Sequence, residues 1–188
     1  DKYKAAADSL AISTSSVKAP RGEIFDCNGK PLVTNRQGNS VVFKYAEFPS
    51  SKKQDERNDL IFSLINLFEK NDIEWRDPLP LKYKKGELIV DKEKETEFEY
   101  MVSENMLEME KGKKSTAEEC LDALIKRYGL ESYSREDARK IASVCFGMKY
   151  SYFSVSSPYT FAEDVPTKII SAIKEKSSTF PGVDADNV

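Results

Sequence analysis

Histidine is absent from the 188 residues of this chain. Its absence excludes Ser-His-Asp and Cys-His nucleophilic catalysis, general-base chemistry by histidine, and ordinary zinc sites. Glycine is scarce as well, and the eight glycines form no phosphate-binding loop. The sequence therefore predicts no metal site and no cofactor.

Long apolar runs and an excess of basic residues are also missing. No apolar run approaches the ~20 residues that a membrane-spanning helix needs. The formal net charge is −3 and the pI is about 5.3, which gives no electrostatic support for binding to nucleic acid. With 39% hydrophobic and 32% charged residues, the chain is expected to fold as one globular domain, or as a domain with a small lobe.

The chain has only three cysteines, and because this number is odd they cannot all form disulfides within the chain. Cys120 and Cys145 stand among apolar residues in segments expected to be helical. We interpret both as small buried hydrophobic side chains.

Apolar side chains recur with helical spacing in several segments. We expect helices over 55–71, from about 97 to 110, and over 116–128, 134–147 and 166–174. Runs rich in β-branched and aromatic residues predict strands at 23–26, 30–34, 40–45, 88–90 and 152–156, with extended chain again from 181. Because helices and strands mix without a regular βαβ alternation, the predicted fold class is α+β.

Two helix ends carry recognisable signals. Ser115 or Thr116, followed by Glu118 and Glu119, predicts a capping box, and Gly129 fits the position just past the end of that helix. The segment 93–110 is ambiguous, because its alternating glutamates suit a solvated strand face while its apolar residues suit a helix. We favour the helix from about Glu97, and we interpret the glutamates, which lysines flank, as a solvated surface rather than a cation site.

Serine acyltransferases combine Ser-x-x-Lys, Ser-x-Asn and Lys-Thr-Gly in that order. Ser-x-x-Lys occurs at Ser15, Ser50 and Ser171, about as often as chance gives for this content of Ser and Lys, and Ser103-Glu104-Asn105 supplies a Ser-x-Asn. No Lys-Thr-Gly or Lys-Ser-Gly follows. Because the chemistry needs that third motif beside the nucleophile, we expect no catalytic residue in this chain.

The stretch 19–32 is the most specific pattern in the sequence. It reads as a strand, a turn at Asn28-Gly29 with positive φ, and a second strand. The order Arg-Gly-x-Ile-x-Asp-x-x-Gly-x-x-Leu, which runs from Arg21 to Leu32, is more specific than a hairpin requires.

This order resembles the first motif of the N-terminal, non-catalytic pedestal or dimerisation domain of class B penicillin-binding proteins. The blocks at 159–166, 169–174 and 180–183 are similar to the segment that closes the head lobe of such domains and re-enters their base. Cys27 departs from the family, which usually has Arg there. The structural motif residues that the resemblance implies are Arg21, Gly22, Ile24, Asp26, Gly29, Pro181 and Gly182.

The resemblance implies a strand-rich base formed by both chain ends, at 19–49 and 179–188, with an inserted, mainly helical head lobe at 50–178. Residues 1–18 would be a lead-in after a removed membrane anchor, which implies the extracytoplasmic face of a bacterial membrane. The implied partners are a transpeptidase domain of the same protein, a membrane glycosyltransferase, and division or elongation proteins. The implied function is to position a peptidoglycan D,D-transpeptidase for cell-wall synthesis.

Arg21 and Asp26 lie five residues apart, so a regular strand would point them to opposite faces and each would need its own partner. We interpret them as structural ion-pairing residues, with a docking surface as the alternative. For the whole chain, the alternative function is a self-standing extracellular binding or sensor domain that uses a similar hairpin.

Overall fold

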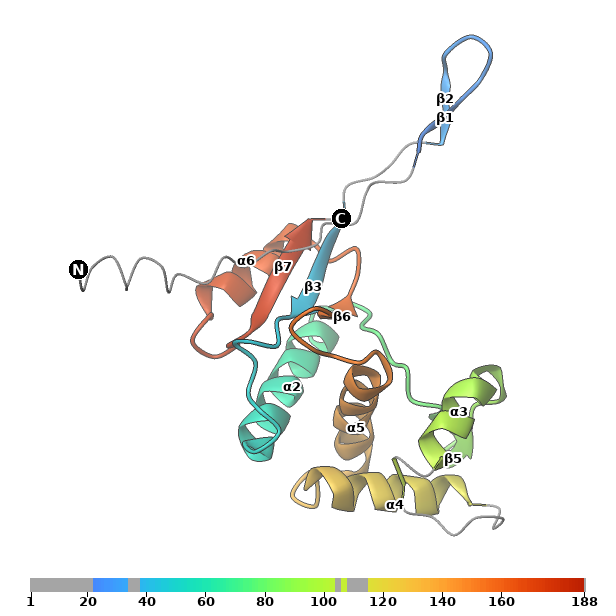
Figure 1. The fold of residues 1–188 in the computed structure, drawn as a ribbon, viewed down its shortest axis with the longest axis vertical. Coiled ribbons are helices and arrows are strands. Elements are labelled where there is room, and N and C mark those ends of the chain that lie inside the picture. Colours follow the sequence, from blue (N-terminus) through green and yellow to red (C-terminus); the bar gives the residue numbers. More distant parts are fainter. Residues whose placement is uncertain (1–21, 34–37, 104–105, 108–114, 188) are drawn as a thin grey trace, which may run out of the picture. The chain divides into compact units, whose positions relative to one another are not determined.

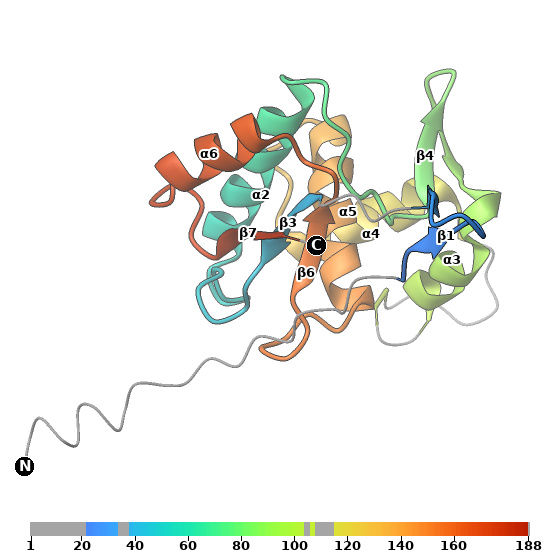
Figure 2. The same cartoon turned by 90° about the horizontal axis from the view of Figure 1, so that it is seen from above.

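The computed structural model describes residues 22–33, 38–103, 106–107 and 115–187. The chain divides into two compact units, 1–37 with 188 and 38–187. The described residues form helices and several small antiparallel sheets (Figures 1 and 2), so the α+β class is confirmed.

The first unit contains a hairpin of β1 (Ile24–Phe25) and β2 (Pro31–Val33). Its turn differs from the prediction, because Gly29 has a φ of 77° whereas Asn28 does not adopt positive φ. The Asp26 amide donates to the Lys30 carbonyl at 2.8 Å, and the Gly29 amide donates to the Asp26 carbonyl at 3.0 Å. Three residues therefore separate the closing pair, and one left-handed glycine is enough for such a loop.

The second unit is organised around the sheet β6-β3-β7, in which β3 (Asn39–Phe43) is central. It pairs antiparallel with β7 (Val183–Asn187), from Asn39 opposite Asn187 to Phe43 opposite Val183. Its other neighbour is β6 (Tyr159–Ala162), also antiparallel. The last strand thus runs beside the strand that precedes the first helix, although the division of the chain into base and head lobe stays a prediction.

Three helices cover this sheet and one another. The first is α2 (Gln54–Glu69), which packs against α5 (Arg135–Tyr150); α6 (Thr167–Glu175) contacts β3 and β7 (Figures 1 and 2). The expected end of α5 near Gly147 is wrong, because the helix continues to Tyr150. Gly147 instead gives a close approach: a Cβ there would lie 2.5 Å from the Tyr159 hydroxyl oxygen.

Two further helices lie at the far end of the unit, α3 (Glu95–Val102) after the short η1 (Lys92–Lys94), and α4 (Ala117–Tyr128). The capping box is confirmed: the Thr116 hydroxyl accepts from the Glu119 amide, and the Glu119 carboxylate accepts from the Thr116 amide. Gly129 has a φ of 62° and ends α4, as the sequence predicts.

One expected strand is wrong, and the strands β4 (Leu81–Lys84) and β6 were not predicted. The expected strand 152–156 is wrong: the serine-rich segment turns there, with Tyr152 at a φ of 54° and a bridge between Ser154 and Ser157. The hairpin of β4 and β5 (Glu87–Val90) extends the expected strand at 88–90 and adds a partner.

The core is continuous through the second unit and rich in aromatic rings. Phe43 stacks on Phe48 and on Phe161, with ring centroids 4.6 and 5.5 Å apart. Cys120 and Cys145 are buried and free, which confirms their interpretation as small core residues.

Candidate functional site

The hairpin residues of the sequence motif take local structural roles. One Asp26 carboxylate oxygen accepts from the Asn28 and Lys30 amides at 2.8 and 2.7 Å, so this side chain holds the turn. Arg21 lies outside the described residues, so its structural ion pair stays a prediction. Gly22 has room for a Cβ, with no heavy atom within 4 Å.

Apolar side chains of the hairpin are not covered by its own two strands. The exposed fractions of Ile24, Phe25 and Leu32 are 56, 52 and 64%. A two-stranded hairpin has no core in which to place them and is marginally stable by itself.

Gly182 lies in a tight turn between α6 and β7. The Val183 amide donates to the Phe180 carbonyl at 3.1 Å, with Pro181 and Gly182 between them. Proline followed by a glycine with φ of 73° matches a type II turn. The Gly182 carbonyl in turn accepts from the Lys44 amide at 2.7 Å, so the turn is hydrogen-bonded directly to the residue that follows β3.

The same glycine allows two backbones to touch. A Cβ on Gly182 would lie 2.4 Å from the Phe48 nitrogen and 2.6 Å from the Phe48 Cα. Both are backbone atoms, which cannot swing away as a side chain can. The Pro-Gly pair of the motif therefore fixes where the returning chain meets the segment between β3 and α2.

An ion pair ties the two strands together at this point. The Lys44 ammonium group donates to the Asp184 carboxylate. Partial burial opposes ionisation of Asp184, but the hydrogen bonds from Lys44 and from the Ala185 amide prevail and lower the pKa of its carboxyl group. The pair is charged at neutral pH and strengthens the pairing of β7 with β3.

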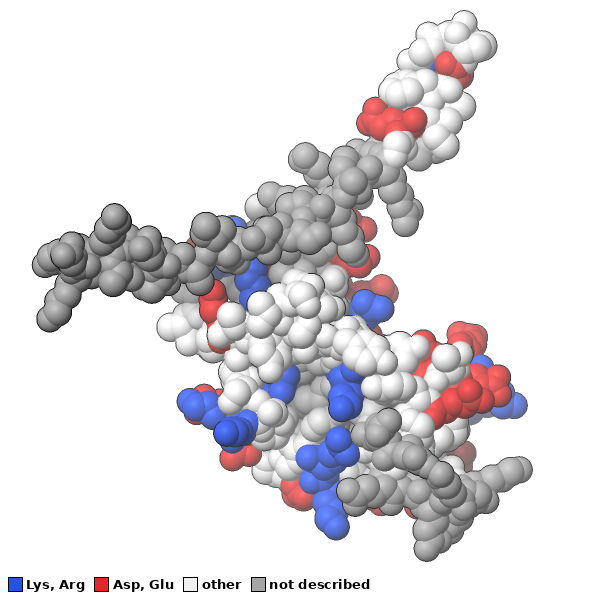
Figure 3. Space-filling model, viewed as in Figure 1, with Lys and Arg blue, Asp and Glu red and all other residues white. Residues whose placement is uncertain are grey.

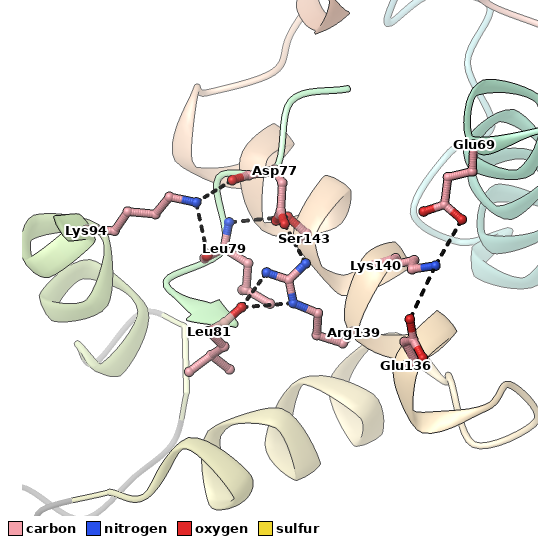
Figure 4. A network of polar contacts seen from close by, with 9 residues as sticks. All are labelled: Glu69, Asp77, Leu79, Leu81, Lys94, Glu136, Arg139, Lys140 and Ser143. Atoms are coloured by element: carbon pink, nitrogen blue, oxygen red, sulfur yellow. Dashed lines mark hydrogen bonds and ion pairs between the residues drawn. The ribbon is translucent and has the colours of Figure 1, made fainter. Parts of the chain in front are cut away.

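A second polar network holds the segment 77–81 on α5 (Figure 4). The buried guanidinium of Arg139 donates to the Asp77 carboxylate at 2.5 Å and, through Nε, to the Leu81 carbonyl at 2.9 Å. Ser143, one turn further along α5, donates to the other Asp77 oxygen and accepts from the Leu79 amide at 3.2 Å. Pro78 and Pro80 prevent regular secondary structure in this segment. Side chains of α5 therefore supply the hydrogen bonds of the Leu79 amide and the Leu81 carbonyl.

Lysines extend the network to both sides. Lys94 donates to the Asp77 and Leu79 carbonyls, and Lys140 pairs with Glu69 at 2.9 Å and with Glu136 at 3.7 Å (Figure 4). The first contact anchors the start of α3, and the second joins α5 to α2. Sequence reasoning missed the network; the available signal was Arg139 and Ser143, spaced by four residues beside an apolar helical stripe.

A comparison with models of known protein families identifies the family of this chain. The model described as "Penicillin-binding Protein dimerisation domain" matches residues 16–188. The chain belongs to this family. No curated protein gives a match.

As a penicillin-binding protein dimerisation domain, the chain is of a non-catalytic type. The structure describes two of its three Ser-x-x-Lys pairs. The Lys53 ammonium group is 2.9 Å from the Glu56 carboxylate, and Ser171 is exposed on α6. The Ser103 hydroxyl donates to the Tyr100 carbonyl at 2.7 Å, while Ser15 lies outside the described residues.

Two features are absent from the residues that the structure describes for this dimerisation domain. None of their helices is both long and apolar enough to cross a bilayer. Over the same residues, no three side chains of the Cys, Asp or Glu type gather as metal ligands would.

Proposed function

We propose that this dimerisation domain is the pedestal of a class B penicillin-binding protein, a peptidoglycan D,D-transpeptidase. In this role it spaces and orients a following catalytic domain at the extracytoplasmic face of the bacterial membrane, to which an N-terminal anchor would hold it. The family match supports the pedestal assignment.

The pairing of β7 with β3 is the observation that carries the mechanical part of the proposal. Five residue pairs join the two strands, and the Gly182 turn and the Lys44–Asp184 ion pair fix their register at one end. A domain that follows β7 would therefore be attached through a hydrogen-bonded sheet rather than through a free linker. Its orientation would be set by the pedestal.

The partners in this proposal are the transpeptidase domain of the same protein, a membrane glycosyltransferase, and proteins of division or elongation. None of these contacts requires chemistry in the pedestal. They require surfaces held in a fixed orientation, which the sheet and the Arg139 network provide.

The coding sequence beyond Val188 tests this proposal. We expect it to encode Ser-x-x-Lys, Ser-x-Asn and Lys-Thr-Gly in that order within one further domain. A reading frame that stops soon after Val188 would contradict the proposal and would favour a self-standing extracellular binding or sensor domain.

A further inference from the structure

A cavity of about 700 Å³ opens in the second unit where the ends of three helices meet. The start of α2, the end of α4 and the end of α5 form its walls, and the segments 45–51 and 153–155 complete its rim. Pockets of ~300–1,000 Å³ accommodate drug-sized ligands, so this cavity has room for several side chains rather than for a single ion.

The charged groups that line the cavity are all positive. They are Arg57, Arg127 and Lys149, one from each helix. Among the described residues no carboxylate lines it, and no ion pair is formed by any of the three cations. Figure 3 shows Lys and Arg side chains gathered on the face where these helices meet.

Arg57 is the most deeply placed of the three cations. Its guanidinium carbon lies 5.2 Å from the centre of the Phe48 ring, and its terminal nitrogen contacts the Met148 sulfur at 3.4 Å. Its Nε is buried and has no hydrogen-bond partner within the described structure. The buried Nε is out of reach of an acceptor that enters the cavity, but the other terminal nitrogen makes no hydrogen bond within the described structure and keeps its donors available.

Two ionisable groups of the wall do not offset this charge. Burial raises the pKa of the Cys145 thiol to about 12, and burial also raises the pKa of the Tyr128 phenol. Both groups are neutral at physiological pH, so neither of them offsets the positive charge of the three cations.

The rest of the lining matches the composition of protein interfaces. Phe48, Phe153 and Met148 supply apolar surface, and Tyr45 and Val155 at the rim are 52 and 76% exposed. Aromatic residues, Met and Arg are enriched at interfaces, and exposed apolar side chains beside a pocket mark contact surfaces. This apolar rim favours a peptide over a small free anion, which would need only the charged part.

We propose that this cavity is the docking site for an acidic peptide segment of a partner protein, with an apolar side chain against Phe48 and Phe153 and carboxylates on Arg57, Arg127 and Lys149. The proposal concerns the second unit alone and stands whether or not the parent protein is a transpeptidase.

A random 12-residue peptide library selected on the 188-residue chain tests the proposal. We expect enrichment of peptides that combine Asp or Glu with an aromatic or large aliphatic residue. Binding of the selected peptides, measured by fluorescence anisotropy, should weaken at least tenfold in Lys149→Glu and in Arg57→Met, and should fall as salt rises.

Lys126→Glu is the matched control. Lys126 and Lys149 are exposed residues in the last turns of α4 and α5, so reversal of either charge carries a similar helix-dipole cost, but Lys126 does not line the cavity. The control should bind the selected peptides as the wild type does. Thermal unfolding of each variant shows whether it is folded.

Three results would overturn the proposal. In the first, the selection enriches no peptides, or only neutral and basic ones. In the second, Lys149→Glu and Lys126→Glu weaken peptide binding equally. In the third, millimolar inorganic phosphate displaces the peptides completely. The last result would identify a site for small anions instead.

Discussion

Replacement of Gly182 by alanine would show how strongly the closure of the sheet depends on one backbone contact. Residue 182 has a φ of 73°, and a left-handed conformation costs a residue with a Cβ about 1–2 kcal/mol. The added Cβ would also lie 2.4 Å from the Phe48 nitrogen, and overpacking of this kind costs about 1–3 kcal/mol. The combined loss of unfolding free energy is therefore about 2–5 kcal/mol.

For a chain of this length each kcal/mol shifts Tm by about 2–4 °C, so Gly182→Ala should lower Tm by about 4–20 °C. Circular dichroism during heating measures the shift. Amide hydrogen exchange should show that β7 loses protection first, because the clash lies where β7 begins.

Gly129→Ala separates the two costs. Gly129 has a similar φ of 62°, but a Cβ there would meet no heavy atom within 4 Å. Only the conformational cost of about 1–2 kcal/mol applies, which predicts a Tm lower by about 2–8 °C. If Gly182→Ala lowers Tm no more than Gly129→Ala does, the close contact with Phe48 does not exist and the reasoning is refuted.

Three further predictions concern the polar groups of the fold. Arg139→Ala should cost about 3–5 kcal/mol, towards the lower end because the Asp77 side chain is 36% exposed. Arg135→Ala, which breaks exposed ion pairs with Glu118 and Asp122, should cost at most about 1 kcal/mol for each pair in urea unfolding. Tyr159→Phe should leave Tm unchanged or raise it, since the buried hydroxyl has no hydrogen-bond partner in the described structure; a fall of several degrees would reveal a partner. The pKa of Asp184 is lowered in the folded state, so its stabilising effect is present above the usual value of about 3.9 and is lost as pH falls through the lowered folded value. Asp184→Asn should therefore cost at most about 1 kcal/mol at pH 7 and should flatten the Tm-against-pH curve below pH 4. A curve that Asp184→Asn leaves unchanged would contradict this role.

Structural features that depend on neighbouring residues could be predicted from the sequence. The α2 stripe, the Thr116–Glu119 capping box and the Gly129 end of α4 all follow from local spacing, and the structure confirms them. The apolar run at 41–43 likewise predicts a strand, and the structure confirms it as β3, whose residues 40–43 are all buried.

Features that depend on distant residues could not be predicted. The strand at 152–156 was misplaced for a local reason, because aromatic and serine residues suit both a strand and a turn. Tyr152 is 77% exposed and takes its positive φ where α5 ends, with the Phe153 amide donating to the Met148 carbonyl at 2.9 Å. The partners of Arg139 lie 58 and 62 residues away, so no local pattern identifies them. The cationic cavity likewise combines side chains from three helices.

Covalent labelling by a fluorescent penicillin tests the central claim, that this chain is a non-catalytic domain, most directly. The 188-residue chain and an active D,D-transpeptidase would be incubated side by side with the probe and separated on a denaturing gel. Because the chain has no Lys-Thr-Gly motif and its Ser50 neighbour Lys53 is paired with Glu56, we predict a labelled band for the transpeptidase and none for the chain. A covalent adduct on Ser15, Ser50 or Ser171 would contradict the account.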